Sequence, residues 1–200
     1  SAHTDPIMKL RRSSDDTEKE FYPTEAGDLG AELGGSGLQL VDWLGGIGSG
    51  VNAHVVVWYD QSGQGHDATQ IDPNLQPKYD PAEKYIDFKT DKYMNLDSNS
   101  APTGNSNYTF VVRHGTIEVD GALFEIGNNS IANGALWLSR TVTGYQTSWG
   151  DENDQHFGTI HTGNTISGSY NGINCKGYIN GELIDIKASS NRNGDNTVAL

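Results

Sequence analysis

Residues 55–70 read VVVWYDQSGQGHDATQ, a run of strand-forming residues that ends abruptly in a polar segment containing two glycines. The β-branched and aromatic residues from Val55 to Tyr59 fit a pleated, largely buried surface. Gly63 and Gly65 accept positive φ, and the short side chain of Asp60 suits hydrogen bonds to nearby backbone amides. The stretch therefore predicts a strand followed by a tight, ordered turn.

The polar residues of this turn have a structural and a catalytic interpretation. Asp60, Gln61 and Ser62 are residue types that most often staple a loop to the strand beside it. We favour this structural role over a catalytic one, because Ser62 lacks the sequence context of a nucleophile elbow.

The whole chain has the composition of an all-β protein. Its 200 residues suit one domain, and 34% hydrophobic residues with 25 glycines indicate many short strands and turns. We predict an antiparallel β-sandwich with long ordered loops that spans residues 1–200 as a single domain. At most one short helix is expected, at the apolar residues around Trp43.

Several strands follow from local patterns. The strongest signal is Asn180-Gly181, which predicts a hairpin over residues 175–186. The prolines between Pro73 and Pro81 favour an ordered loop or an edge strand. Further strands are predicted at residues 7–12, 55–59, 85–88, 93–96, 108–112, 117–119, 122–126, 135–141 and 145–149.

Charge and cysteine content exclude several classes of function. The net charge of −13 is unfavourable for nucleic-acid binding, and it suits an acidic, soluble surface or divalent cations. The single cysteine, Cys175, excludes an intramolecular disulfide and a cysteine-rich zinc site. The histidines show no zinc-site spacing, and no segment has the pattern of a membrane span.

A resemblance to a known superfamily covers most of the chain. The segment Trp58-Tyr59-Asp60-Gln61-Ser62-Gly63 resembles a signature of concanavalin A-like (laminin-G-like) jelly-roll domains. It is similar in particular to the catalytic domain of the α-L-arabinofuranosidase B family, as are LRRSSD at residues 10–15, Gln76-Pro77 and IDF at residues 86–88. The resemblance implies a jelly roll that lacks its first and last strands here, or has them completed by another segment.

The same resemblance bears on catalysis. Retaining glycosidases use two carboxyl groups about 5 Å apart. The resemblance puts Ala122 at the position of the nucleophile, and alanine cannot attack a sugar. Glu125 would replace it only with a local change of register. The acid would correspond to Asp195, for which a plain turn aspartate is the alternative interpretation.

Aromatic residues on adjacent strands suggest a sugar-binding surface. Sugar rings stack on aromatic faces while polar neighbours bond the hydroxyl groups. The alternative is that these tryptophans belong to the core. The candidate ligand-binding residues are Trp137, Tyr145, Trp149 and Asn153, with Ser139, Gln146 and Thr147 as polar neighbours.

One acidic loop is a candidate calcium site. Asp151, Glu152 and Asp154 offer carboxylate oxygens close together, and the resemblance implies calcium in loops at one rim of the sandwich. A solvated charged loop is an equally good interpretation.

The favoured hypothesis is a non-catalytic carbohydrate-recognition or adhesion module of a larger extracellular, cell-surface or viral protein. Its expected partners are a glycan or cell-surface polysaccharide and flanking domains, without nucleic acid or membrane insertion. The alternatives are a glycoside hydrolase related to α-L-arabinofuranosidases, which would use Glu125 and Asp195, and a structural spacer that binds nothing. A fold by itself does not decide among these.

Overall fold

The computed structural model divides the chain into two compact units, Ser1–Asp97 and Ser98–Leu200. The prediction of a single domain stays a prediction. In the part of the chain that the structure describes, no helix has the length and apolar character that crossing a membrane would require. The described residues are 4–31, 38–88, 91–96, 107–115, 121–127, 135–141, 144–149, 155–157, 165–171, 174–188 and 198–199.

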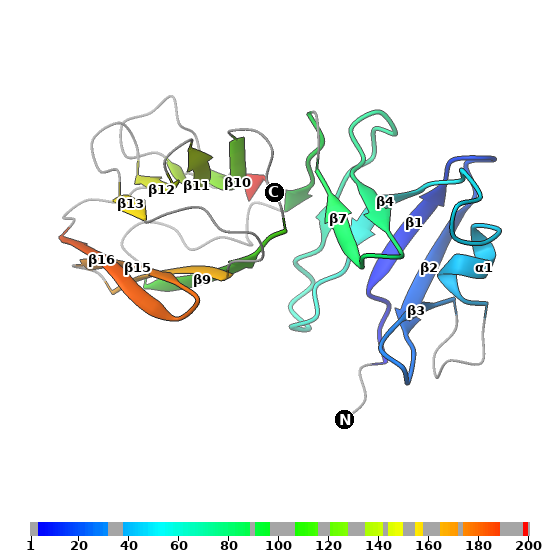
Figure 1. The fold of residues 1–200 in the computed structure, drawn as a ribbon, viewed down its shortest axis with the longest axis horizontal. Helices are drawn as coiled ribbons and strands as arrows, with labels where there is room; N and C mark the ends of the chain where they lie inside the picture. Colours follow the sequence, from blue (N-terminus) through cyan, green and yellow to red (C-terminus); the bar gives the residue numbers. More distant parts are fainter. Residues whose placement is uncertain are drawn as a thin grey trace. The chain divides into compact units, whose positions relative to one another are not determined.

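The first unit is built on an antiparallel sheet with the strand order β8-β5-β4-β1-β2-β3 (Figure 1). A short strand, β6, also pairs with β4 and with β7. The strands are β1 (Met8–Arg12), β2 (Glu18–Pro23), β3 (Leu29–Gly30), β4 (Ala53–Trp58), β5 (Ala68–Thr69), β6 (Lys78–Asp80), β7 (Tyr85–Asp87) and β8 (Asn95–Leu96).

Strand β4 confirms the prediction made from the valine run, because Val55 and Val56 are both buried. Adjacent residues of a strand belong to opposite faces, so β4 is covered on both sides. Helix α1 (Leu40–Trp43) forms where the apolar pattern predicts a helical turn. Its Trp43 ring packs against Phe21 of β2 with 5.2 Å between ring centroids.

Polar residues contribute to the core of this unit. Gln70 is 3% exposed and Gln76 is 2% exposed. Among the apolar residues of this unit, Met94 is fully buried. Strand β6 lies within the segment from Pro73 to Pro81, which the sequence assigns to an ordered loop or an edge strand.

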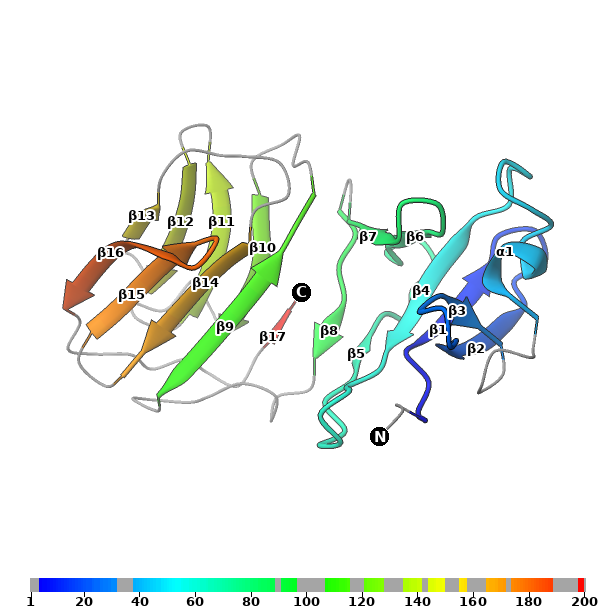
Figure 2. The ribbon, with the colours of Figure 1, turned by 60° about the horizontal axis from the view of Figure 1, so that its bottom comes forward.

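The second unit contains two antiparallel sheets (Figure 2). One has the order β13-β12-β11-β10-β17, and the other is four-stranded with the order β16-β15-β14-β9. Strand β13 lies against β15 and β16 of the second sheet. The strands are β9 (Tyr108–Arg113), β10 (Gly121–Gly127), β11 (Ala135–Thr141), β12 (Gly144–Trp149), β13 (Gln155–Phe157), β14 (Thr165–Tyr170), β15 (Asn174–Ile179), β16 (Glu182–Ala188) and β17 (Val198–Ala199).

The predicted hairpin is confirmed by β15 and β16, which pair across Asn180 and Gly181. Both turn residues have positive φ, at 52° and 84°. This backbone conformation is the one that the Asn-Gly dipeptide accepts most readily in a two-residue hairpin turn.

The sequence did not predict β2 and β14, nor the short strands β3, β5, β13 and β17, and one predicted strand was too long. No local pattern indicated a strand at residues 18–23 or at residues 165–170. The predicted strand at residues 93–96 is only β8, Asn95–Leu96. The predicted strand at residues 117–119 lies outside the described residues.

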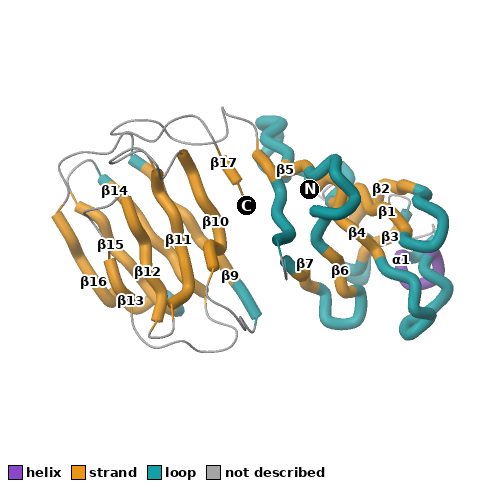
Figure 3. The backbone as a smooth tube through the Cα atoms, turned by 90° about the horizontal axis from the view of Figure 1, so that it is seen from above, coloured by secondary structure: helices purple, strands orange, loops and turns teal. Residues whose placement is uncertain are grey.

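Strands dominate the backbone, and α1 is the one helix among the described residues (Figure 3). The paired strands with stated register are antiparallel. The prediction of an all-β, antiparallel sandwich with at most one short helix is therefore confirmed.

Candidate functional site

The turn after β4 is organised by the Asp60 carboxylate. It accepts hydrogen bonds from the amides of Ser62, Gln64 and His66 and from the Ser62 hydroxyl, at 2.7–3.2 Å. These bonds, led by that of the Ser62 hydroxyl, hold the pKa of Asp60 well below its usual range. The Asp60 amide in turn donates to the Asp67 carboxylate at 2.8 Å. Asp60 therefore stabilises its own loop.

Gln61 and Tyr59 attach this loop to neighbouring strands. The Gln61 side-chain amide donates to the carbonyls of Pro6 and Tyr59, at 3.0 and 2.9 Å. The Tyr59 hydroxyl donates to Glu20 of β2 at 2.7 Å, and the pKa of Tyr59 is raised by burial and by this carboxylate. The interpretation of the turn as a structural staple is confirmed.

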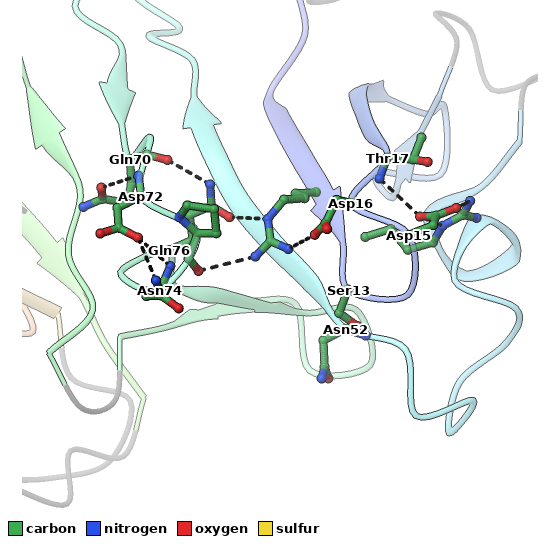
Figure 4. Close-up of polar contacts among 12 residues, drawn as sticks. Ser13, Asp15, Asp16, Thr17, Asn52, Gln70, Asp72, Asn74 and Gln76 are labelled. Atoms are coloured by element: carbon green, nitrogen blue, oxygen red, sulfur yellow. Dashed lines mark hydrogen bonds and ion pairs between the residues drawn. The ribbon is translucent and has the colours of Figure 1, made fainter.

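The paired arginines of β1 are also structural. Arg11 donates from Nε to Oε1 of Gln76 at 2.8 Å and from Nη1 to Asp16 at 2.6 Å (Figure 4). The Gln76 side-chain amide donates to the Gln70 carbonyl at 3.0 Å. Arg11 and Gln76 belong to two separate segments that carry the family resemblance, so these segments are joined directly to each other.

Arg12 makes a second ion pair on the opposite side of β1. Its Nη2 lies 2.5 Å from Asp15, and its Nη1 donates to the Trp43 carbonyl at 2.8 Å. The guanidinium also lies 5.0 Å from the centre of the Trp43 ring. The hydrogen bond from Arg12 lowers the pKa of Asp15 to about 2. Arg12 therefore joins the turn at Asp15 to the end of α1.

Sequence reasoning missed two contributors to this unit. Glu20 accepts from the hydroxyls of both Tyr59 and Tyr22, and the buried Gln70 positions Gln76. The segment Gln76-Pro77 did stand out through the resemblance, but nothing local in the sequence predicted its contact with Arg11.

The predicted sugar-binding residues of β11 and β12 fall into two sets by register. Trp137 pairs with Glu125 of β10 and with Ser148 of β12. Tyr145 and Trp149 pair instead with Arg140 and Leu136. Directly paired residues share a face and strand neighbours alternate, so Trp137 belongs to the opposite face from Tyr145 and Trp149. Asn153 lies outside the described residues.

These two faces differ in composition. In β10 to β12, the Trp137 face consists of Ala122, Glu125, Gly127, Ala135, Trp137, Ser139, Thr141, Gly144, Gln146 and Ser148. The Trp149 face consists of Gly121, Phe124, Ile126, Leu136, Leu138, Arg140, Tyr145, Thr147 and Trp149.

An irregularity in β10 affects Glu125, the residue that the alternative hydrolase hypothesis would use. The register between β10 and β11 shifts between Ala122 and Phe124. Ala122 pairs with Ser139 and Glu125 pairs with Trp137, two positions of β11 that share a face. The β-bulge thus brings Glu125 onto the face of Ala122, although the two residues are three positions apart and regular alternation would put them on opposite faces. Asp195, the other predicted carboxylate, lies outside the described residues.

The predicted calcium ligands, Asp151, Glu152 and Asp154, also lie outside the described residues. Within the part that is described, no cluster of three or more histidine, cysteine or acidic side chains is arranged to hold a metal ion.

Comparison with known proteins finds no matching family model and no matching curated protein. The fold is similar to solved structures of arabinofuranosidases. One is a glutamate-to-glutamine mutant of a GH54 α-L-arabinofuranosidase soaked with 4-nitrophenyl α-L-arabinofuranoside, with a TM-score of 0.68 and 14% identity. Another is a GH54 α-L-arabinofuranosidase soaked with a cyclic sulfate inhibitor, with a TM-score of 0.63 and 15% identity.

A further structure is an arabinofuranosidase complexed with arabinofuranosyl-α-1,2-xylobiose, with a TM-score of 0.62 and 12% identity. Each of these comparisons covers 100% of this chain and 52% of the other. The chain therefore spans about half the length of these structures. At such identities the similarity shows the fold, and it agrees with the arabinofuranosidase resemblance at that level.

Proposed function

We propose that this chain is a non-catalytic carbohydrate-recognition or adhesion module, and that its sugar-binding surface is the Trp137 face. The observation that carries the proposal is the register of Trp137, which lies between Glu125 and Ser148 on adjacent strands. An aromatic residue flanked by polar residues is the arrangement that sugar recognition requires, because the ring meets C–H groups while its neighbours bond hydroxyls.

The composition of the two faces supports this choice over Tyr145 and Trp149. One face of an antiparallel sheet in a sandwich packs on the core and is apolar, and the other is polar. The Trp149 face carries most of the large apolar residues, so we expect it to be the core face. Tyr145 and Trp149 then form the alternative platform, to be favoured only if this assignment fails.

The non-catalytic part of the proposal rests on Ala122, which the resemblance aligns with the nucleophile. We assign the module to a larger extracellular, cell-surface or viral protein, with a glycan or cell-surface polysaccharide as its partner. The similarity of its fold to carbohydrate-active enzymes supports a role with sugars.

A glycoside hydrolase is the second candidate, and one observation favours it. Glu125 could act in place of the missing nucleophile only if the register of β10 changes locally. The β-bulge between Ala122 and Phe124 provides such a change. Glu125 would then act from the same face as Trp137, with Asp195 or another carboxylate as the acid.

A binding experiment and an activity experiment together separate the two candidates. The purified chain is applied to a glycan array with and without calcium, and it is incubated with 4-nitrophenyl α-L-arabinofuranoside. We expect binding to at least one glycan class and no release of nitrophenol. Hydrolysis that Glu125→Gln abolishes would support the hydrolase instead, and an array without any binding would contradict the recognition module.

A further inference from the structure

One row of directly paired residues runs across all the strands of the four-stranded sheet. Val111 of β9 pairs with Ser167 of β14, Ser167 pairs with Tyr178 of β15, and Tyr178 pairs with Leu183 of β16. Val111 is 65% exposed and Leu183 is 45% exposed. One row therefore crosses all four strands with an aromatic residue, a hydroxyl and two exposed apolar side chains.

This row lies on the outer face of its sheet. The intervening residues of β14, which are Ile166, Gly168 and Tyr170, are buried, whereas Thr165, Ser167 and Ser169 are only half-buried. Since residues of a strand alternate between faces, the buried set marks the inner face and the row belongs to the other. We call Val111, Ser167, Tyr178 and Leu183, with Arg113 and Lys176 beside them, the outer patch.

The charge of the outer patch is opposite to that of the chain. Arg113 follows Val111 by two residues on β9, and Lys176 precedes Tyr178 by two residues on β15, so both share the face of the row. Neither cation has an ion pair with another described residue, and the patch contains no carboxylate. Two cations without an ion pair to any described residue therefore flank an aromatic row, in a chain of net charge −13.

We propose that the outer patch binds an anionic polysaccharide whose sugar units carry carboxylates. Tyr178 and the adjacent apolar side chains would contact the C–H faces of the rings, and Ser167 would bond hydroxyls. Arg113 and Lys176 would pair with carboxylates at two separated points. Strand spacing of about 4.8 Å and a rise of about 3.4 Å per residue put their Cα atoms about 17 Å apart, which suits an extended polymer with repeated charges.

Charge also argues against a nucleic acid as the occupant. A nucleic acid requires clustered cations along a phosphate backbone, and the patch offers two. The choice of a polysaccharide rests on the proposed carbohydrate role, but the patch lies on a different sheet from Trp137, so the two surfaces are tested separately.

The experiment measures binding of polygalacturonate oligosaccharides by isothermal titration calorimetry, with fully methyl-esterified oligosaccharides of the same length as the neutral comparison. We expect the charged form to bind more tightly and its affinity to fall with added salt. Arg113→Gln and Lys176→Gln are each expected to weaken binding about two- to fivefold, the range for exposed ion pairs. Lys78→Gln, at an exposed position in β6, is the matched control and should leave binding unchanged.

Several outcomes would overturn the inference. Equal affinity for charged and esterified oligosaccharides, or an affinity that the Arg113→Gln/Lys176→Gln double variant preserves, would remove the outer patch as an anion-binding surface. Equal binding of polyglutamate would make the patch a general polyanion site rather than a glycan site. Loss of polygalacturonate binding in Trp137→Ala, with the double variant unaffected, would assign the anionic ligand to the Trp137 face. Glycan-array binding that depends on Trp137 would sustain the proposed function even if the patch binds nothing.

Discussion

Gly168 of β14 lies directly opposite Phe110 of β9, and a Cβ atom added to Gly168 would lie 2.4 Å from Cε1 and Cζ of the phenylalanine ring. Gly168 is buried on the inner face of its sheet, so the aromatic ring occupies the space that a side chain would need. The missing side chain is therefore part of the packing of this strand pair.

We expect Gly168→Ala to destabilise the protein by about 1–3 kcal/mol, the usual range for overpacking, as measured by urea denaturation. Ser167→Ala, at the next position and on the outer face, should change the free energy of unfolding by less than about 0.5 kcal/mol. Adding Phe110→Leu to Gly168→Ala should recover part of the loss. An unaltered stability of Gly168→Ala would contradict the packing.

The same residue explains why β14 was missed in the sequence. Its buried positions are Ile166, Gly168 and Tyr170, and a glycine at the centre interrupts the apolar alternation that predicts a strand. Strand β2 was also missed, because its fully buried residue, Phe21, lies in a segment rich in charged residues. By contrast, β4 and the hairpin could be predicted, since a run of valines and an Asn-Gly turn are local signals.

The candidate site was predictable only in part, for a related reason. The aromatic residues of β11 and β12 could be named from composition, but which of them share a face depends on pairing with β10 and on its bulge. No local pattern specifies a bulge at Ala122 to Phe124. The Arg11–Gln76 contact joins residues 65 positions apart and was equally invisible in the sequence.

The Asp60 loop offers a test of its structural role. Asp60→Ala removes the acceptor for the amides of Ser62, Gln64 and His66, so we expect a lower melting temperature and faster hydrogen exchange at these amides. Asp60→Asn, which keeps one oxygen acceptor, should have a smaller effect. Because the folded pKa of Asp60 is depressed, its contribution to stability is present above the unfolded pKa of about 3.9 and is lost as the pH falls below it. Normal exchange at the amides of Asp60→Ala would contradict the assignment.

His54 predicts a pH dependence of stability in a milder range. Burial lowers its pKa, and Arg11, Lys92 and Lys78 lower it further. Its Nδ1 atom is buried without a hydrogen-bond partner in the described part of the chain. The unfolded chain therefore binds more protons than the folded one below pH about 6.5, so stability is complete above that value and falls as the pH decreases.

We expect His54→Gln to reduce the loss of stability between pH 7 and pH 5, as measured by urea denaturation at several pH values. A packing defect in the variant would lower its stability at pH 7 and at pH 5 alike. The difference in stability between these two pH values therefore isolates the titration of His54. A pH profile parallel to that of the wild type would show that His54 does not cause the dependence.

The proposed calcium site leads to a prediction about metal removal. A cation that binds only the folded chain stabilises it by mass action, by about 2.7 kcal/mol at a free concentration 100 times its Kd. If Asp151, Glu152 and Asp154 hold calcium, excess chelator should lower the melting temperature, and Asp151→Asn/Asp154→Asn should abolish that sensitivity. An identical melting curve with and without chelator would exclude calcium as a ligand.

The last prediction decides which face of the sheet β13-β12-β11-β10-β17 recognises sugar. Alternation along residues 145–149 fits Trp149 either as a surface platform or as a core residue, and the register separates it from Trp137. If the apolar Trp149 face is the core, Trp149→Ala should cost about 3–5 kcal/mol in the free energy of unfolding. Trp137→Ala should then keep the melting temperature near that of the wild type and lose glycan binding. Denaturation curves and array binding of the two variants, measured together, give opposite patterns for the two assignments. A stable Trp149→Ala variant without glycan binding, beside an unstable Trp137→Ala variant, would move the site to Tyr145 and Trp149.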